Sequence, residues 1–241
     1  VNDHQTAHHN MNLPIPSSAV KAVTTISGPG TALFGPSAFA GAVDIVPRKP
    51  ENSGLAMQTS IGTFKTRKTE VTAAFADDRS AALAASQYSS SEGFKEGTDY
   101  ESVTSWASSW FTTENTRTRI SAGHTDRDFG AQDFYAPYPS RERIRTTLVD
   151  AKPEIFFSKQ WSIEAQFQYR RNKDNFVLIE NDPSIYQNEN VTESLTERLT
   201  VQSSKERNNT ALGAEWSDAF LDSSNLGNRK TRCSAAFAQH S

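Results

Sequence analysis

Extended segments of this chain, from about residue 54 onward, are joined alternately by short polar turns and by longer loops. The short turns fall at 77–80, 114–117, 158–161 and 205–208, and the long loops near 91–102, 128–142, 172–192 and 218–230. A soluble β-sandwich has no reason to place every long loop at one end. A β-barrel in an outer membrane does, since its periplasmic turns are tight and its external loops are long. The asymmetry therefore favours a membrane barrel over an enzyme.

Apolar and polar side chains alternate most clearly over residues 161–170. One predicted face carries Trp161, Ile163, Ala165, Phe167 and Tyr169, whereas the other carries Ser162, Glu164, Gln166, Gln168 and Arg170. Ten residues are about the length that a tilted strand needs to cross the hydrocarbon of a bilayer. A soluble sandwich also alternates, because one face of each sheet is buried. Alternation alone therefore leaves both architectures open, and the loop asymmetry decides between them.

The same pattern, in weaker form, predicts about ten strands. They lie near 54–64, 67–77, 80–90, 103–114, 116–127, 143–157, 161–173, 194–204, 209–218 and 231–240. An open sheet of this size has two exposed edge strands, which can pair with other chains and cause aggregation. Further strands that close the sheet into a barrel would remove these edges. The predicted fold class is all-β, a partial transmembrane antiparallel β-barrel that lacks some of its strands.

Composition narrows the function classes. The net charge of −3 gives no basic signature for binding nucleic acid. Hydrophobic residues make up only 36%, and no run reaches the roughly 18 apolar residues of a spanning helix. Such values usually indicate a soluble protein, and they equally suit a transmembrane barrel, whose strands show lipid an apolar residue only at every second position. With Cys233 as the only cysteine, the chain has no internal disulfide and no cysteine metal site.

Residues 1–50 differ in amino-acid composition from the rest of the chain. They hold six of the ten prolines, namely Pro14, Pro16, Pro29, Pro36, Pro47 and Pro50. Glycines cluster there as well, which predicts a compact region of short elements and tight turns. Neither a basic start nor an apolar core of a signal peptide is present at residues 1–5, so we expect an internal piece of a longer protein. A domain boundary is predicted at residue 50, between regions 1–50 and 51–241.

Three motifs in the first region carry a family resemblance. LPIP at 13–16, GPGTALFG at 28–35 and FAGAVDIV at 39–46 resemble the end of the plug domain of TonB-dependent outer-membrane receptors. The segments 3–11, 128–137 and 169–178 are similar to the subgroup of cobalamin-type transporters. The resemblance implies that 1–50 is the C-terminal part of a small α+β plug and that 51–241 is the N-terminal part of the barrel.

The resemblance also implies a function: energy-coupled uptake of a scarce ligand, such as a ferric siderophore or cobalamin, across the cell outer membrane. Its implied partners are the TonB energy-coupling protein, outer-membrane lipid and lipopolysaccharide, and a small-molecule or metal-chelate ligand. Neither an enzymatic activity nor a cofactor is expected, because no phosphate-binding glycine loop and no nucleophile elbow is present. A passive porin-like barrel and a soluble all-β carbohydrate-binding module remain alternatives.

Two positions depart from the family pattern. Ser27 stands where the family has an arginine that is thought to pair with acidic residues of the barrel and help to seat the plug. A proline, Pro47, lies in the last plug strand, where it removes one ladder donor and is tolerable only at the strand end. We therefore do not expect the electrostatic locking that the family arginine is thought to supply.

The candidate ligand-binding residues are His8, His9, Asn10, Phe134 and Tyr135. Imidazoles on a plug surface suit a metal chelate. Aromatic rings in a loop at the barrel mouth suit a bulky amphipathic ligand, although the same rings also fit a self-packed loop. True metal sites are not expected. His4, His8 and His9 match no ligand spacing, and neither do Asp126, Asp128 and Asp133.

Overall fold

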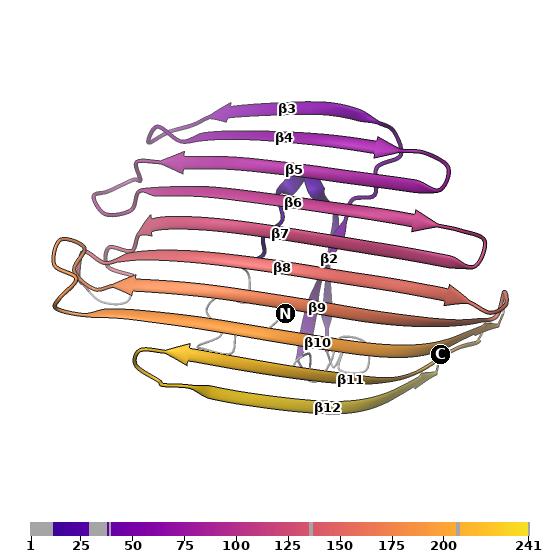
Figure 1. Ribbon diagram of the computed structural model, residues 1–241. Helices are drawn as coiled ribbons and strands as arrows, with labels where there is room; N and C mark the ends of the chain where they lie inside the picture. Colours follow the sequence, from indigo (N-terminus) through magenta and orange to yellow (C-terminus); the bar gives the residue numbers. More distant parts are fainter. Residues whose placement is uncertain (1–11, 29–37, 39, 135–136, 206–207, 241) are drawn as a thin grey trace.

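The structure is a computed structural model that describes residues 12–28, 38, 40–134, 137–205 and 208–240. Within these residues the chain forms a two-stranded and a ten-stranded antiparallel sheet (Figure 1). A short 3-10 helix, η1 (Ser17–Ala19), precedes the smaller sheet of β1 (Val20–Ser27) and β2 (Gly41–Pro47). No helix in the described ranges has the length and apolarity to cross a membrane.

The large sheet is a meander in which each strand pairs with the next along the chain. Its members are β3 (Gly54–Ile61), β4 (Arg67–Ala76), β5 (Ser80–Ser91), β6 (Tyr100–Thr112), β7 (Thr116–Gly130), β8 (Arg141–Phe156), β9 (Trp161–Val177), β10 (Gln187–Lys205), β11 (Asn208–Ser223) and β12 (Arg229–His240). The predicted ten-strand all-β fold class is therefore confirmed.

The short turns are closed by the side chain of a residue at their start. The Asp77 carboxylate accepts the backbone N–H of Arg79 at 2.8 Å, and the hydroxyl oxygen of Thr113 accepts that of Thr116 at 3.0 Å. In the β8–β9 turn, the hydroxyl oxygen of Ser158 accepts the N–H of Trp161 at 3.1 Å. Side chains that satisfy turn N–H groups in this way make tight reversals without glycine. These turns share one end of the sheet, at the right of Figure 1.

The opposite end carries the longer loops, at 62–66, 92–99, 131–140, 178–186 and 224–228. The asymmetry between the two ends is as predicted, but the predicted loop bounds at 172–192 and 218–230 are wrong. There, β9 continues to Val177 and β10 begins at Gln187. Backbone pairing between β9 and β10 continues past the residues that alternate between apolar and polar side chains. A strand stays hydrogen-bonded to its neighbour whether or not its side chains are apolar, because the backbone groups make the bonds.

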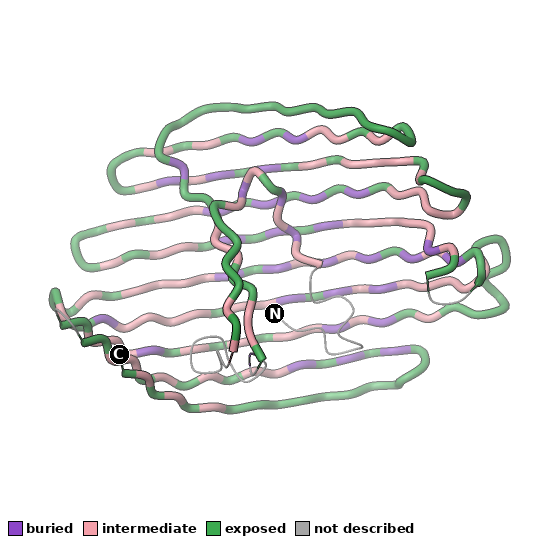
Figure 2. Tube along the Cα trace, turned by 180° about the vertical axis from the view of Figure 1, so that it is seen from behind, coloured by how far each residue is buried: buried purple, intermediate pink, exposed green. Residues whose placement is uncertain are grey.

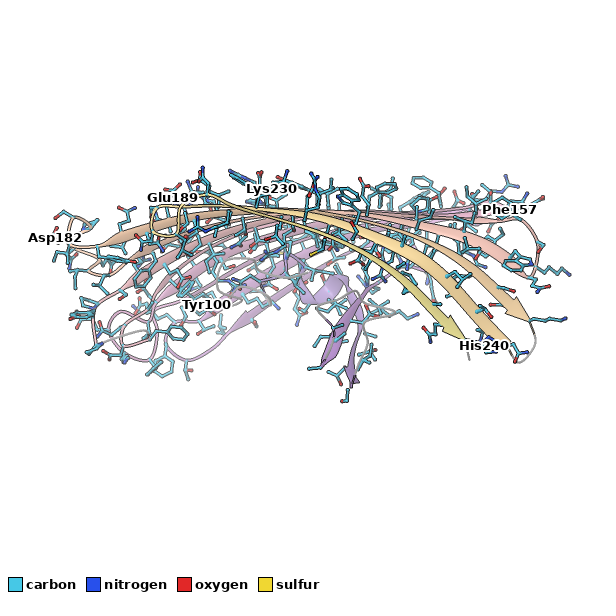
Figure 3. All side chains as sticks on the ribbon, turned by 90° about the horizontal axis from the view of Figure 1, so that it is seen from below. Tyr100, Phe157, Asp182, Glu189, Lys230 and His240 are labelled. Atoms are coloured by element: carbon cyan, nitrogen blue, oxygen red, sulfur yellow. The ribbon has the colours of Figure 1, made fainter. Side chains whose placement is uncertain are left out.

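The two faces of the large sheet differ in polarity. Large apolar side chains are exposed on its convex face, and they include Leu55, Met57, Val71, Phe75, Val103, Phe111, Ile120, Val149, Ile155, Trp161, Phe167, Leu195, Leu199, Leu212, Trp216 and Phe220. The concave face carries mostly polar side chains. Figure 3 shows this curvature, with Tyr100 on the concave side and Glu189 on the convex side.

Polar pairs cross-link neighbouring strands on the concave face. The hydroxyls of Thr104 and Thr125 are 2.8 Å apart, and Arg119 Nη2 lies 2.5 Å from Asp150 Oδ1. Arg119 therefore faces the concave side, where the buried Asp150 carboxylate accepts a hydrogen bond from its guanidinium. A sheet that is apolar outside and polar inside is the reverse of a soluble sandwich and has the pattern of a barrel wall.

The β1–β2 hairpin stands on the concave side of the large sheet (Figure 2). Its close pairing depends on Gly41, because a Cβ there would lie 2.6 Å from the carbonyl oxygen of Ile26. Ser27 pairs with Gly41 at the tip of the described hairpin. Pro47 is the last residue of β2, the strand-end position that proline tolerates. Residues 29–35 of the glycine-rich motif lie outside the described residues.

Candidate functional site

Residues 12–19, which we call the anchor segment, lie against the concave face of β4 to β8. The side chain of Glu70 receives two hydrogen bonds there. Its Oε1 accepts the backbone N–H of Ser18 at 2.9 Å, and its Oε2 accepts the Ser17 hydroxyl at 3.3 Å. Lys68 Nζ lies 3.3 Å from the same Oε2 atom. Glu70 is a buried carboxylate with each oxygen bonded, the arrangement in which burying a charge is tolerated.

An apolar cluster fixes the middle of the anchor segment. Ala19 is fully buried against Trp106 and Leu148, and Ile15 packs against the same cluster. Gly123 faces Trp106 across the β6–β7 pair. A Cβ at Gly123 would clash with the Pro14 carbonyl oxygen and would lie 2.5 Å from Trp106 Cε3. Because position 123 has no side chain, the backbone of the anchor segment can reach the wall.

Arg127 holds the start of the described segment. Its Nη1 donates to the Asn12 side-chain oxygen at 3.2 Å. Within the described residues, the contacts that seat the N-terminal region thus come from residues 12–19, and not from Ser27 at the far end of β1. In place of the missing family arginine, the seat combines the buried carboxylate of Glu70, the hydroxyl of Thr72, the guanidinium of Arg127 and one apolar cluster.

Three loops at the long-loop end are bonded to one another, and together we call them the rim cluster (92–99, 131–140 and 178–186). The N–H of Gln132 donates to the Gly97 carbonyl at 3.1 Å, joining the first two loops. The N–H of Glu180 donates to the Pro139 carbonyl at 2.9 Å, joining the last two. Backbone bonds between loops make this end of the wall a single unit.

Arg141 ties β7 to two loops of the rim cluster, 92–99 and 178–186. Its Nε donates to Asp128 Oδ1 at 2.6 Å, and its Nη1 lies 3.2 Å from Asp99 Oδ2 and 3.0 Å from Glu180 Oε1. The planar guanidinium presents several donors in fixed directions, so one arginine can hold three carboxylates. Three anions around one cation also explain why a lysine would serve less well here.

Replacing Arg141 by alanine is expected to loosen the rim cluster without unfolding the wall. Exposed ion pairs contribute up to about 1 kcal/mol, so amide hydrogen exchange in the three loops should accelerate on the order of five-fold. Hydrogen exchange followed by mass spectrometry of the complete protein measures this. Arg229→Ala is the matched control, since Arg229 donates to the adjacent Asn228 carbonyl. Equal exchange in both variants would show that Arg141 does not join the loops.

A hollow of about 470 Å³ lies on the concave face beneath the rim cluster, and we call it the rim hollow. Its lining comprises Gln87, Ser89, Thr98, Asp99, Tyr100, Ser102, Arg127, Phe129 and Gly130. The lining combines a half-buried guanidinium, two aromatic rings and several hydroxyls. Such a set suits an anionic or hydrogen-bonding ligand that also has flat apolar surface. Arg127 contacts both this hollow and Asn12, so it connects the ligand space with the anchor segment.

Of the residues predicted to bind a ligand, Phe134 is the one within the described ranges. It is 74% exposed, in the loop 131–140 of the rim cluster. His8, His9, Asn10 and Tyr135 lie outside the described residues. Sequence reasoning missed Arg127 and Tyr100. The pairing of β6 with β7 brings them together in the rim hollow, and no local sequence motif marks them.

The three aspartates Asp126, Asp128 and Asp133 are each paired with cations of their own, which no two of them share. Asp126 binds Arg143 and Arg145, Asp128 binds Arg141, and Asp133 binds Lys95 at 2.7 Å. In the exposed loop, the hydrogen bond from Lys95 lowers the pKa of Asp133. Across the described part of the chain, no group of three His, Cys, Asp or Glu side chains is arranged to hold a metal ion.

Comparison with solved structures identifies the fold. The ferric-catecholate import receptor Fiu from E. coli matches with a TM-score of 0.69 and 13% identity, over 83% of this chain and 39% of Fiu. The siderophore receptor PiuA from Acinetobacter baumannii matches with 0.71 and 16%, over 85% and 36%. The copper transporter OprC matches with 0.72 and 15%, over 87% and 35%. No family model and no curated protein matches the sequence.

These matches define a class of fold. The chain has the fold of part of a TonB-dependent outer-membrane receptor, with a curved antiparallel barrel wall and a short hairpin segment on its inner face. It spans less than two fifths of the length of the three receptors above. At 13–16% identity, the likeness extends to the fold and not to the ligand.

Proposed function

We propose that this chain is part of an outer-membrane receptor that takes up a scarce ligand by TonB-dependent transport. The observation that carries the proposal is the anchor segment, which is seated on a polar inner wall directly below a hollow at the long-loop rim. A passive pore has no need for a segment bonded to its wall across the lumen. A receptor that opens on demand does, because the segment must close the lumen until energy is supplied.

In this proposal the rim hollow receives the ligand from outside. Arg127 and the aromatic rings of Tyr100 and Phe129 bind it from the wall side, and Phe134 contacts it from the rim cluster. His8, His9, Asn10 and Tyr135 remain proposed ligand contacts from the sequence. Ligand binding and plug position are coupled through Arg127, which contacts both the hollow and the anchor segment.

The polar inner wall suits movement of the plug. Carboxylate, hydroxyl and guanidinium groups of the wall bond the anchor segment, and water can replace such partners when the segment leaves. An apolar interface would lose burial with every step of release. We infer that residues 1–50 are the C-terminal part of the plug and that residues 51–241 are the N-terminal part of the barrel. The apolar convex face then contacts outer-membrane lipid.

The proposed ligand class is a metal chelate, with a ferric siderophore ahead of cobalamin. The names of Fiu and PiuA specify ferric-catecholate and siderophore ligands, and that of OprC specifies copper. Cobalamin rests on the sequence resemblance alone. The proposed partners are the TonB protein and lipopolysaccharide, and we propose no enzymatic activity.

The test is uptake by cells that carry the complete gene. Labelled ferric siderophores, copper and cobalamin are offered to cells with and without TonB, in the presence and absence of the proton gradient. We expect saturable uptake of one metal chelate that is lost when either TonB or the gradient is removed. Uptake that continues without TonB would indicate a passive porin-like barrel. A protein found in the aqueous fraction after detergent phase separation would indicate a soluble module.

A further inference from the structure

Arg127 is the cation that lines the rim hollow. Ser102 lies directly opposite it on β6, and Tyr100 and Phe129 face each other on the next pair of the same face, toward the long loops. These side chains share the concave face, where Figure 3 shows Tyr100. The guanidinium is half-buried, so this part of the hollow combines a cation, a hydroxyl and two aromatic rings.

No carboxylate is bonded to Arg127 within the described ranges. Its hydrogen bond there runs from Nη1 to Asn12 Oδ1 at 3.2 Å, and no ion pair includes it. Arg198, on the same face of the wall, differs in this respect, because it contacts the Glu215 carboxylate at 2.5 Å. A guanidinium carries several N–H donors in a fixed plane. Most of the donors of Arg127 therefore remain for an acceptor that enters the hollow.

The strand register explains why Arg127 lacks a carboxylate partner. Ile144 lies opposite it on β8, and the next residue in the row, Asp174 on β9, is two strand spacings or about 10 Å away. Glu142 is a diagonal neighbour, since it lies opposite Phe129. In the described part of the chain, neither carboxylate forms an ion pair with Arg127. A half-buried cation without an anionic partner is costly, and an anion that binds it removes that cost.

Asn12 is a weaker partner for Arg127 than an anion would be. A hydrogen bond between a guanidinium and an anionic oxygen is about twice as strong as one between neutral groups, and a pair of anionic oxygens can accept two parallel bonds. Asn12 offers one neutral amide oxygen. It is also the first described residue of the anchor segment. An anion that displaces Asn12 therefore removes one contact of this segment, while the contacts of Glu70 and of the apolar cluster remain.

We propose that Asn12 occupies the anion-binding position of Arg127 until a ligand arrives, and that the ligand is an anionic metal chelate whose oxygens displace Asn12. The inference rests on the proposed function and narrows its ligand class from metal chelates in general to those with a net negative charge. Neutral chelates gain nothing from the exchange. Because coupling between two sites is reciprocal, a weaker contact at Asn12 strengthens ligand binding, and ligand binding loosens the start of the anchor segment.

The test measures binding of two chelates to the complete receptor in detergent by titration calorimetry. The probes are an anionic ferric tris-catecholate and a neutral ferric tris-hydroxamate of similar size. The variants are Asn12→Ala, Asn12→Asp, Arg127→Gln and the double variant with Asn12→Asp and Arg127→Gln. Ser17→Ala is the matched control, because it removes another polar contact of the anchor segment, the 3.3 Å bond to Glu70, without touching Arg127. Unaltered heat-modifiable migration on gels shows that each variant is folded.

We expect the unaltered receptor to bind the anionic chelate more tightly than the neutral one. Asn12→Ala should strengthen binding of the anionic chelate about three-fold, because it removes the competitor. Asn12→Asp should weaken it more than about ten-fold, because a carboxylate stays on the guanidinium. Arg127→Gln should weaken it to a similar extent, and in that background Asn12→Asp should have no further effect. Ser17→Ala should change binding of both chelates alike, by less than about two-fold.

Three results would overturn the proposal. The first is equal or tighter binding of the neutral chelate, or no binding of either chelate. The second is an Asn12→Asp variant that binds the anionic chelate as the unaltered receptor does. The third is a gain in Ser17→Ala equal to that in Asn12→Ala, which would mean that Asn12 acts only by loosening the segment. TonB-dependent uptake of copper or cobalamin would still support the proposed function in each case, so the two failures are distinguishable.

Discussion

Replacing Trp106 by alanine is expected to lower the free energy of unfolding of the complete receptor by about 3–5 kcal/mol, the range for large aromatic residues in well-packed sites. Trp106 is 6% exposed and packs with Leu83, Ala85 and Leu148 against Ala19 of the anchor segment. Truncation leaves a cavity between the wall and this segment. Urea unfolding in lipid vesicles, followed by the gel mobility of folded and unfolded forms, measures the loss.

A second tryptophan supplies the control. Trp216 lies on the convex face and is 45% exposed, so Trp216→Ala removes a side chain that packs less and leaves no enclosed cavity. Its effect should be less than half that of Trp106→Ala. Limited proteolysis adds a local readout, since only Trp106→Ala should expose the anchor segment to cleavage. Similar losses in both variants, with no change in cleavage, would mean that Trp106 does not seat the segment.

Gly123→Ala is expected to displace the anchor segment from the wall at a cost of about 1–3 kcal/mol, the usual range for overpacking. The added methyl group meets the carbonyl oxygen of Pro14, which is backbone, and the ring of Trp106. Neither neighbour can yield by a simple rotation. The same unfolding assay measures the cost, and cleavage of the anchor segment reports the displacement.

Gly54 provides the matched control for Gly123. It begins β3, and a Cβ there meets no described atom within 4 Å. Gly54→Ala is expected to be neutral or to stabilise slightly, because alanine loses less backbone entropy than glycine in a strand. Should Gly123→Ala unfold at the same urea concentration as Gly54→Ala, with the anchor segment still protected, the close contact with Pro14 would be refuted.

The wall of the barrel was predictable because each of its signals is local. Residues 161–170 alternate between apolar and polar side chains, and β9 places Phe167 on the convex face and Gln168 on the concave face, as that pattern requires. Turns such as 77–80 contain the acceptor that closes them. Signals of this kind depend on two to four neighbouring residues, so they can be recognised in the sequence without any knowledge of the tertiary structure.

The ends of the strands next to the long loops could not be predicted from local sequence patterns. From Arg171 to Asn175, β9 carries polar side chains on both faces, which resembles a loop in sequence. These residues remain in a strand because their backbone groups pair with β10, from Gln187↔Val177 to Glu193↔Arg171. The hydrogen-bond ladder maintains the strand there, and it leaves no pattern in the side chains.

The candidate site was predictable only in outline. Phe134 was named from an aromatic loop, and it lies in the rim cluster. The seat of the anchor segment depends on Glu70, Trp106 and Gly123, which come from three strands far apart in sequence. Their meeting is set by the register of three strand pairs, and no single segment encodes it. An isolated glycine inside β7 was the one available signal, since glycine in a strand often marks a close backbone approach.

The most direct measurement is the accessibility of spin labels along β9 in the complete receptor, reconstituted in lipid vesicles. Cys233 is exposed, so it is first replaced by serine. Labels are then attached to single cysteines at positions 163 to 168, and their collisions with oxygen, which concentrates in lipid, are measured. We expect high oxygen accessibility at 163, 165 and 167 and low accessibility at 164, 166 and 168. Uniform accessibility, or the opposite alternation, would contradict a wall with lipid on its convex face and a polar lumen on the other.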